Sequence, residues 1–186
     1  QGLHRQQRLP TRHFATGRTR CWRGGTLTTT SDVGAVIDDM VARGVFRAAP
    51  VKNDAGVVFA WRIKWFSGHE MRLAATGDEV KVDDVLPPLA AQSQLYRDLR
   101  VWLKAQQSAD LPAHRRVDPT RIALKVKNSG GQIRLSLSSH SESSATLAKR
   151  MVQLIHALYL DFLNGPGRLE WVTEAFGLDP DNPRFS

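Results

Sequence analysis

The chain has 186 residues, of which 41% are hydrophobic and 24% charged, a composition that suits one globular domain with extensions. Its formal net charge of +8 favours polyanionic partners or anionic surfaces. The single cysteine, Cys21, excludes an internal disulfide and therefore a secreted disulfide scaffold, and no apolar stretch reaches the roughly 18 residues that a membrane span needs.

The positive charge is concentrated at the N-terminus. Residues 1–23 contain six arginines and no acidic residue, whereas residues 24–186 carry a net charge of only +2. Residues 1–30 also lack apolar periodicity and end in the polar run GGTLTTT. We therefore predict an Arg-rich, extended N-terminal arm over residues 1–30.

The first helix is predicted to begin after Ser31, whose hydroxyl can accept a hydrogen bond from a backbone N–H of the first turn. Its apolar residues recur at helical spacing, and Gly44 is the expected stop. The residues of this apolar face are Val33, Val36, Ile37, Met40 and Val41.

Three strands are then predicted over residues 57–66, 70–76 and 79–85, because apolar and polar residues alternate there. Their expected apolar faces comprise Phe59, Trp61, Ile63, Trp65, Met71, Leu73, Ala75, Val80 and Val82. The sequence LPP ends this segment, since proline cannot donate to a strand ladder.

Helices and strands are also predicted in the second half of the chain. A helix is predicted within residues 90–107. A β-hairpin follows, with strands over 122–127 and 133–137 joined by the turn sequence NSGG. A long helix is predicted over roughly 144–163, and a short helix over 168–177 precedes an acidic tail.

The resulting order, α–βββ–α–ββ–α–α, predicts an α+β fold. We expect an antiparallel sheet of about five strands with helices packed on one face, in two layers, plus the N-terminal extended arm. The expected organisation is an arm over 1–30, an α+β core domain over 31–164, and a C-terminal short helix with an acidic tail over 165–186.

The sequence contains no catalytic motif. The histidines form no pair at metal-ligand spacing, and no phosphate-binding glycine motif occurs. SSHSESS places Ser138, Ser139 and Ser141 around His140 and Glu142, but triad members normally come from separated segments, so we interpret it as a loop that caps the next helix. We expect a non-catalytic protein without cofactor or metal. The alternative is an enzyme whose pocket holds strongly shifted titratable groups.

The second face of the predicted sheet is basic. If helices cover the apolar face, alternation leaves more cations than carboxylates on the open one. Since Phe59, Trp61 and Trp65 are expected on the core side, we predict phosphate contacts or shape recognition of RNA rather than base stacking. The alternative is that the charges only keep this face soluble. The cations are Arg62, Lys64, Arg72, Lys81, Lys125, Lys127 and Arg134, and the carboxylates are Glu70, Glu79 and Asp83.

The arm resembles mitochondrial presequences, which are Arg-rich and poor in acidic residues. Its segment RHFAT also resembles the Arg–X–Phe pattern of a common matrix-protease site, with cleavage after Phe14. We nevertheless expect the arm to be retained and to bind a partner, with arginine forks on phosphates and stacking by Trp22 or Phe14. Its RNA-binding candidates are Arg5, Arg8, Arg12, Arg18, Arg20, Trp22 and Arg23.

These features predict a non-catalytic RNA-contacting subunit of a large mitochondrial ribonucleoprotein, similar to a mitochondrial ribosomal protein. We expect it in the matrix or on the matrix side of the inner membrane, with its acidic C-terminal segment on protein neighbours. The alternative is an accessory, supernumerary subunit of a mitochondrial inner-membrane respiratory or ATP synthase complex that binds no RNA.

Overall fold

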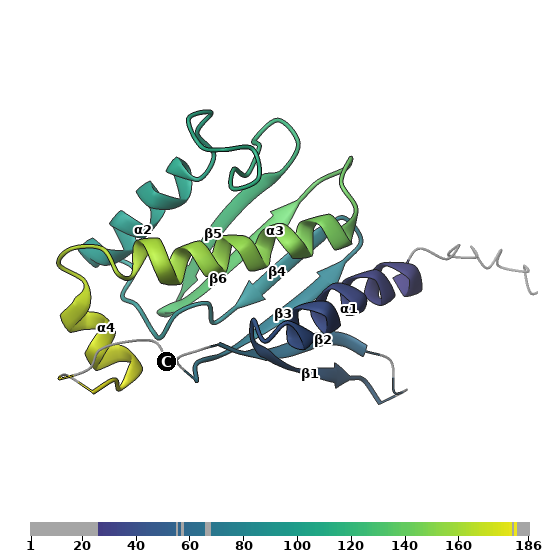
Figure 1. Cartoon of the computed structure of the whole chain (residues 1–186), viewed down its shortest axis with the longest axis horizontal. Helices are drawn as coiled ribbons and strands as arrows, with labels where there is room; N and C mark the ends of the chain where they lie inside the picture. The colour runs from purple at the N-terminus through teal and green to yellow at the C-terminus, as the bar shows by residue number, and fades with distance from the viewer. Residues whose placement is uncertain (1–25, 55, 57, 66–67, 180, 182–186) are drawn as a thin grey trace, which may run out of the picture.

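The fold has two layers, a six-stranded antiparallel sheet and a layer of helices (Figure 1). The predicted α+β class, with helices on one face of an antiparallel sheet, is confirmed. The predicted arm lies outside the described residues up to position 25. This computed structural model describes residues 26–54, 56, 58–65, 68–179 and 181.

The sheet has the strand order β1-β2-β3-β4-β6-β5, and every neighbouring pair is antiparallel. The strands are β1 (Arg47–Lys52), β2 (Val58–Lys64), β3 (Glu70–Thr76), β4 (Glu79–Asp83), β5 (Ala123–Ser129) and β6 (Gln132–Ser138). Gly130 and Gly131 connect β5 to β6, both at positive φ, as a two-residue hairpin turn requires. The predicted hairpin is therefore confirmed.

Strand β1 is the strand that the sequence pattern does not predict. It contains Pro50, which lacks a backbone N–H, and two alanines, which are poor strand formers. β1 lies at an edge of the sheet, where one side of the strand needs no ladder hydrogen bonds, so Pro50 is tolerated opposite Trp61. The sheet therefore has six strands, one more than the five or so predicted.

Helix α1 (Thr26–Ala42) begins earlier than predicted. Ser31 lies inside the helix, so its predicted role as N-cap is wrong, and residues 26–30 of the predicted arm are helical. The C-terminus is as expected: Gly44 has φ 72°, its N–H donates to the Val41 carbonyl, and the Val45 N–H donates to the Met40 carbonyl. These two bonds form a Schellman motif.

The expected apolar face of α1 is largely correct. Its first four members are buried, but Val41 is 37% exposed. Val41 lies one residue beyond Met40 in the last turn, where the buried stripe of a helix ends first.

The remaining helices follow the predicted segments. They are α2 (Gln94–Ala105), α3 (Ser144–Ala157), the π-helical turn η1 (Leu158–Phe162) and α4 (Leu169–Phe176). The hydroxyls of Ser93 and Ser143 accept hydrogen bonds from backbone N–H groups of α2 and α3 and cap these helices. The predicted helix over 144–163 therefore continues through a final π-helical turn, and α4 ends at Gly177 with φ 62°.

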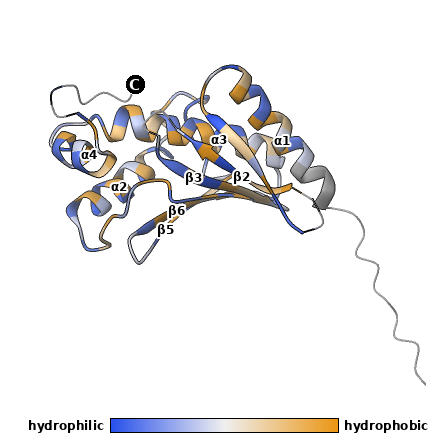
Figure 2. Ribbon diagram, turned by 90° about the horizontal axis from the view of Figure 1, so that it is seen from below, coloured by the Kyte–Doolittle hydropathy of each residue, from blue (hydrophilic) through white to orange (hydrophobic). Residues whose placement is uncertain are grey.

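Helices α1 and α3 lie across the same face of the sheet (Figures 1 and 2). The strand residues beneath them are fully buried, including Leu73, Val80, Val82, Ile133, Leu135 and Leu137. Because side chains alternate along a strand, burial of this set leaves the other set on the opposite face. Figure 2 shows the layers edge-on, and none of the described helices lies over that opposite face.

The π-helical turn η1 is attached to the loop that follows β4. Tyr159 is 1% exposed, and its hydroxyl donates to the carbonyl of Val85 at 3.2 Å. The N–H of Val85 donates to the carbonyl of Ile133 at 3.1 Å. The loop is therefore held both by β6 and by the end of the long helix.

Replacing Tyr159 by Phe is expected to lower the free energy of unfolding by about 1–2 kcal/mol, because a buried carbonyl loses a donor. Urea unfolding should show a lower midpoint with an unchanged m-value. Tyr96→Phe is the control, since no hydrogen bond of its hydroxyl is found among the described residues. An unchanged midpoint for Tyr159→Phe would contradict the attachment.

Candidate nucleic-acid interface

The uncovered face of the sheet is basic. Residues directly opposite each other on neighbouring strands point to the same face, and Arg62 lies opposite Arg72 while Lys127 lies opposite Arg134. The set, called the basic face below, comprises Arg47, Arg62, Lys64, Arg72, Lys81, Lys125, Lys127 and Arg134 with Glu70, Glu79 and Asp83. All seven predicted cations therefore share one face, and β1 adds Arg47, opposite Lys64.

Most cations of the basic face have no carboxylate partner. Asp83 accepts a hydrogen bond from Arg134 Nε across β4 and β6. This hydrogen bond, together with the negative charge of Asp83, raises the pKa of Arg134. Among the described residues, Arg134 is the only cation of the basic face in an ion pair. The other seven cations are therefore available to an anionic partner.

A hollow of about 260 Å³ lies where β4, β5 and β6 meet on this face. Its lining gathers the cations Arg72, Lys127 and Arg134, with Asp83 and Asp84 beside them. Lys127 and Arg72 extend to it from strands on opposite sides of β4 and β6. The hollow thus brings cations of three strands together, although its two carboxylates offset much of their charge.

A β-bulge in β2 changes the position of Phe59. Val51 pairs with Ala60, but the next residue of β1, Lys52, pairs with Val58, so Phe59 is an extra residue in β2. Val58 packs against the core, and Phe59 is 39% exposed. The expectation that Phe59 points into the core is therefore wrong, because the bulge reverses the alternation at this point.

Phe59 lies among the cations of the basic face. The Arg72 guanidinium carbon is 5.2 Å from the centre of its ring, which is cation–π distance. Trp61 and Trp65, in contrast, are buried as predicted, at 5% and 3% exposure. Among the described residues, the basic face therefore carries one accessible aromatic ring, that of Phe59, which strict alternation would place in the core. At this point the sequence contains the unbroken apolar run VVFA, so the strict alternation of apolar and polar residues fails there.

The arm candidates cannot be placed beside the basic face. Arg5, Arg8, Arg12, Arg18, Arg20, Trp22 and Arg23 all lie outside the described residues. The structure thus brings together the sheet candidates Arg62, Lys64, Arg72, Lys125, Lys127 and Arg134, and it is silent on the arm.

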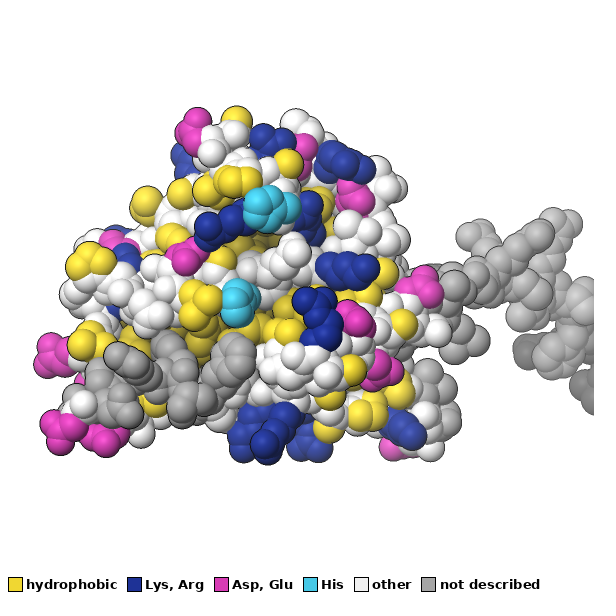
Figure 3. All heavy atoms as spheres, viewed as in Figure 1, with side chains coloured by type: hydrophobic (Ala, Val, Ile, Leu, Met, Phe, Trp, Pro, Cys, Tyr) yellow, Lys and Arg dark blue, Asp and Glu magenta, His cyan; other side chains and the backbone are white. Residues whose placement is uncertain are grey.

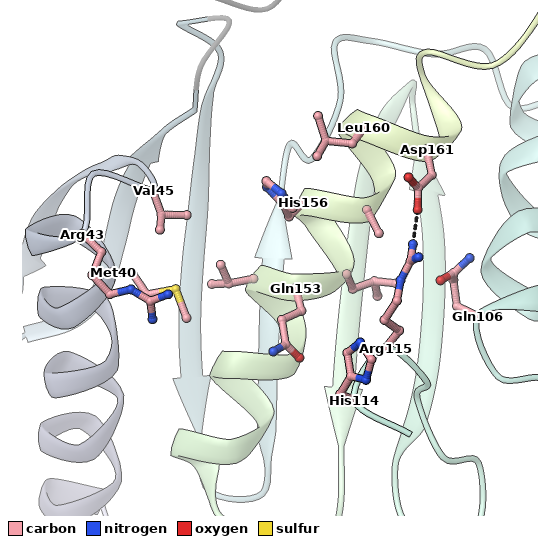
Figure 4. Close-up of a pocket in the computed structure, with 13 residues that line it drawn as sticks. Met40, Arg43, Val45, Gln106, His114, Arg115, Gln153, His156, Leu160 and Asp161 are labelled. Carbon is pink, nitrogen blue, oxygen red and sulfur yellow. Dashed lines mark hydrogen bonds and ion pairs between the residues drawn. The ribbon is translucent and has the colours of Figure 1, made fainter. Parts of the chain in front are cut away.

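The helix side of the molecule is different in character. Figure 3 shows basic and acidic side chains interspersed there with apolar ones. A hollow of about 520 Å³ lies on this side between α1, α3 and the segment before β5 (Figure 4). Arg115 forms an ion pair with Asp161 at one wall, and His156 and Leu160 lie nearer α1. Its described lining contains two histidines but no Ser, Thr, Cys or Lys to serve as a nucleophile.

The segment SSHSESS is a capping loop, as interpreted from the sequence. The hydroxyl of Ser139 accepts hydrogen bonds from the N–H groups of Ser141 and Glu142, and Ser143 caps α3. His140 is exposed and lies 2.9 Å from Asp78, on the turn between β3 and β4. The hydroxyls of Ser139 and Ser143 are thus engaged in backbone hydrogen bonds.

No protein-family model and no curated protein matches this sequence. None of the helices in the described part combines the length and the apolar character of a membrane span. Nor do three or more His, Cys, Asp or Glu side chains of that part gather as a metal site. The geometry and charge of the described surfaces therefore carry the indications of function.

The β2 bulge predicts a small loss of stability at one aromatic residue and a large loss at another, two positions away. Phe59→Ala is expected to cost about 1 kcal/mol of unfolding free energy, because only a partly exposed ring and one exposed cation–π contact are lost. Trp61→Ala is expected to cost about 3–5 kcal/mol, because it empties a core site. Chemical denaturation measures both, and equal losses would contradict the bulge.

Proposed function

We propose that this chain is a non-catalytic RNA-contacting subunit of a large mitochondrial ribonucleoprotein, comparable in role to a mitochondrial ribosomal protein. The observation that carries the proposal is the basic face. It sets eight cations against three carboxylates on an uncovered antiparallel sheet, with one exposed aromatic ring among them.

The phosphate backbone supplies most of the affinity in this proposal. Each phosphate that a Lys or Arg neutralises releases a counterion from the nucleic acid, which makes binding salt-dependent. Among the described residues, seven cations of the basic face are in no ion pair with a carboxylate that phosphate would have to displace. Phosphate binding therefore requires no internal ion pair to break, except at Arg134.

Phe59 changes the expected mode of RNA binding. An open sheet with cations and an exposed aromatic ring suits single strands, whose unpaired bases stack on such rings. Arg72 lies over the Phe59 ring, and a guanidinium plane also accepts a stacked base. We therefore propose single-stranded RNA, held by its phosphates and by one stacked base, in place of the shape recognition expected from the sequence.

The arm supports both the compartment and the partner in this proposal. Its six arginines without an acidic residue resemble a mitochondrial presequence, and arginine also binds phosphates in a bidentate manner. We propose that the arm adds phosphate contacts to those of the basic face. The matrix, or the matrix side of the inner membrane, is the proposed location.

A protein-only role is the second candidate, and α4 favours it. The segment from α4 onward carries exposed Glu170, Glu174, Asp179 and Asp181, and Leu169 is 55% exposed beside them. Acidic residues repel RNA, so this end suits a protein neighbour. An accessory subunit of an inner-membrane respiratory or ATP synthase complex would use this surface without RNA.

The role of the basic face is tested by measuring the affinity of the full chain for a labelled single-stranded RNA of twelve nucleotides. Phe59→Ala should weaken binding about tenfold, because one stacked base is lost. Lys125→Ala/Lys127→Ala should lower the slope of log affinity against log salt by about 1.4.

The matched control is Lys104→Ala/Lys149→Ala, which removes two exposed charges from the helix layer. Its salt slope should stay close to that of the unchanged protein. Equal effects of the two double variants would show that net charge, and not the basic face, governs binding.

A deletion variant tests the arm, and co-purification from cells tests the kind of assembly. Deletion of residues 1–25 should weaken RNA binding at least tenfold, because six arginines are removed. The tagged full chain should also lose its mitochondrial co-purifying partners after nuclease treatment. Unchanged RNA affinity would remove the arm from the proposal, and partners that persist after nuclease would favour the accessory-subunit role.

A further inference from the structure

A groove lies between α2 and β5, away from the basic face and from the hollow of Figure 4. It has a volume of about 470 Å³. Its apolar part is formed by Leu103 of α2 and by Leu124 and Val126 of β5. Two elements that are not adjacent in the chain, α2 ending at Ala105 and β5 beginning at Ala123, therefore build one surface feature at the edge of the sheet (Figure 1).

The charged residues on the helix wall of this groove are all basic. Arg97, Arg100, Val101 and Lys104 lie at spacings of three and four residues, which places them on one side of α2. Val101 is 70% exposed, more than any other large hydrophobic side chain of the described residues. The Arg97 guanidinium donates to the side chain of Gln94, and no ion pair of these three cations occurs among the described residues.

The strand wall of the groove is an open sheet edge. Within the described residues, β6 is the only strand paired with β5. No backbone hydrogen bond outside that pairing reaches residues 123–129 from another described segment. An antiparallel strand with one neighbour leaves every second backbone N–H and C=O directed outward, so β5 can accept a further strand.

The two edges of the sheet differ in this respect. At the other edge, β1 carries Pro50, and the β2 bulge interrupts the ladder behind it. Both features oppose the addition of a strand. β5 has neither proline nor bulge, and its exposed side chains include Lys125 and Lys127.

We propose that the groove between α2 and β5 binds an extended acidic segment of a partner protein, which adds to the sheet as a strand beside β5. Glutamate or aspartate at alternate positions faces Lys125 and Lys127. The intervening apolar residues face Leu124, Val126 and Val101. Further acidic residues of the partner, at the ends of the added strand, pair with Arg97, Arg100 and Lys104 of the helix wall.

Charge decides against a second copy of this chain as the occupant. Pairing β5 with β5 of another copy would bring Lys125 and Lys127 of both strands close together, and like charges on opposed strands destabilise pairing. The backbone edge and the apolar part of the groove favour a peptide over RNA, since neither feature recognises a phosphate backbone. This inference does not depend on RNA binding by the basic face.

The test uses the full chain and a fluorescein-labelled peptide in which glutamate alternates with valine over eight residues and two further glutamates at each end can reach the helix wall. We expect saturable binding, a weaker response to a peptide with lysine in place of glutamate, and slower hydrogen exchange of the β5 backbone amides in the complex. Arg100→Glu and Val101→Asp, both at exposed positions, should each weaken binding at least fivefold.

Lys149→Glu is the matched control, because Lys149 is exposed on α3 and does not line the groove. It should leave peptide affinity within twofold of the unchanged protein. Absence of peptide binding, absence of β5 protection, or equal effects of Arg100→Glu and Lys149→Glu would overturn the proposal.

The twelve-nucleotide RNA provides a separate readout. Arg100→Glu and Lys149→Glu should affect RNA affinity equally, since both positions lie outside the basic face. If Arg100→Glu weakens RNA binding selectively and leaves peptide binding intact, the groove is an RNA surface and the peptide proposal fails. Failure of the peptide arm with intact RNA binding leaves the proposed function standing.

Discussion

Helices α1 and α3 pack on the apolar side of the sheet, and this packing decides where the charged side chains lie. The strand residues beneath them, such as Ile133, Leu135 and Leu137, have no exposed surface. A cation among them would have to give up its hydration without a partner, at a cost of several kcal/mol. Strands β2 to β6 therefore place their Lys and Arg residues on the opposite face, and the basic face is a consequence of how the core is formed.

The same arrangement gives the surfaces of the molecule different chemical character. The basic face is open because the described helices lie on the other side, and it holds one exposed ring because the β2 bulge turns Phe59 toward its cations. The groove beside β5 exists because α2 packs next to an edge strand. We propose two anionic partners of different shape for this domain, a single-stranded RNA on the basic face and an extended acidic peptide beside β5, and Lys125 and Lys127 belong to both surfaces.

Period-two alternation was sufficient to assign most of the basic face, because cross-strand neighbours follow directly from strand parity. Lys125, Lys127 and Arg134 are found where the pattern predicts them. The pattern fails at Phe59, since one extra residue in β2 reverses the parity and no local signal states which residue is extra. It also misses β1, whose Pro50 is acceptable only at a sheet edge, and it starts α1 too late at Ser31.

The sequence by itself determined the α+β class, the positions of most elements and the two-faced character of the strands, because these depend on the local spacing of apolar residues. It also determined that six arginines gather in residues 1–23. The tertiary structure alone decided which strands form edges, which side of the sheet holds Phe59, and that α2 lies along β5. These features depend on contacts between segments distant in the chain, which no local pattern encodes.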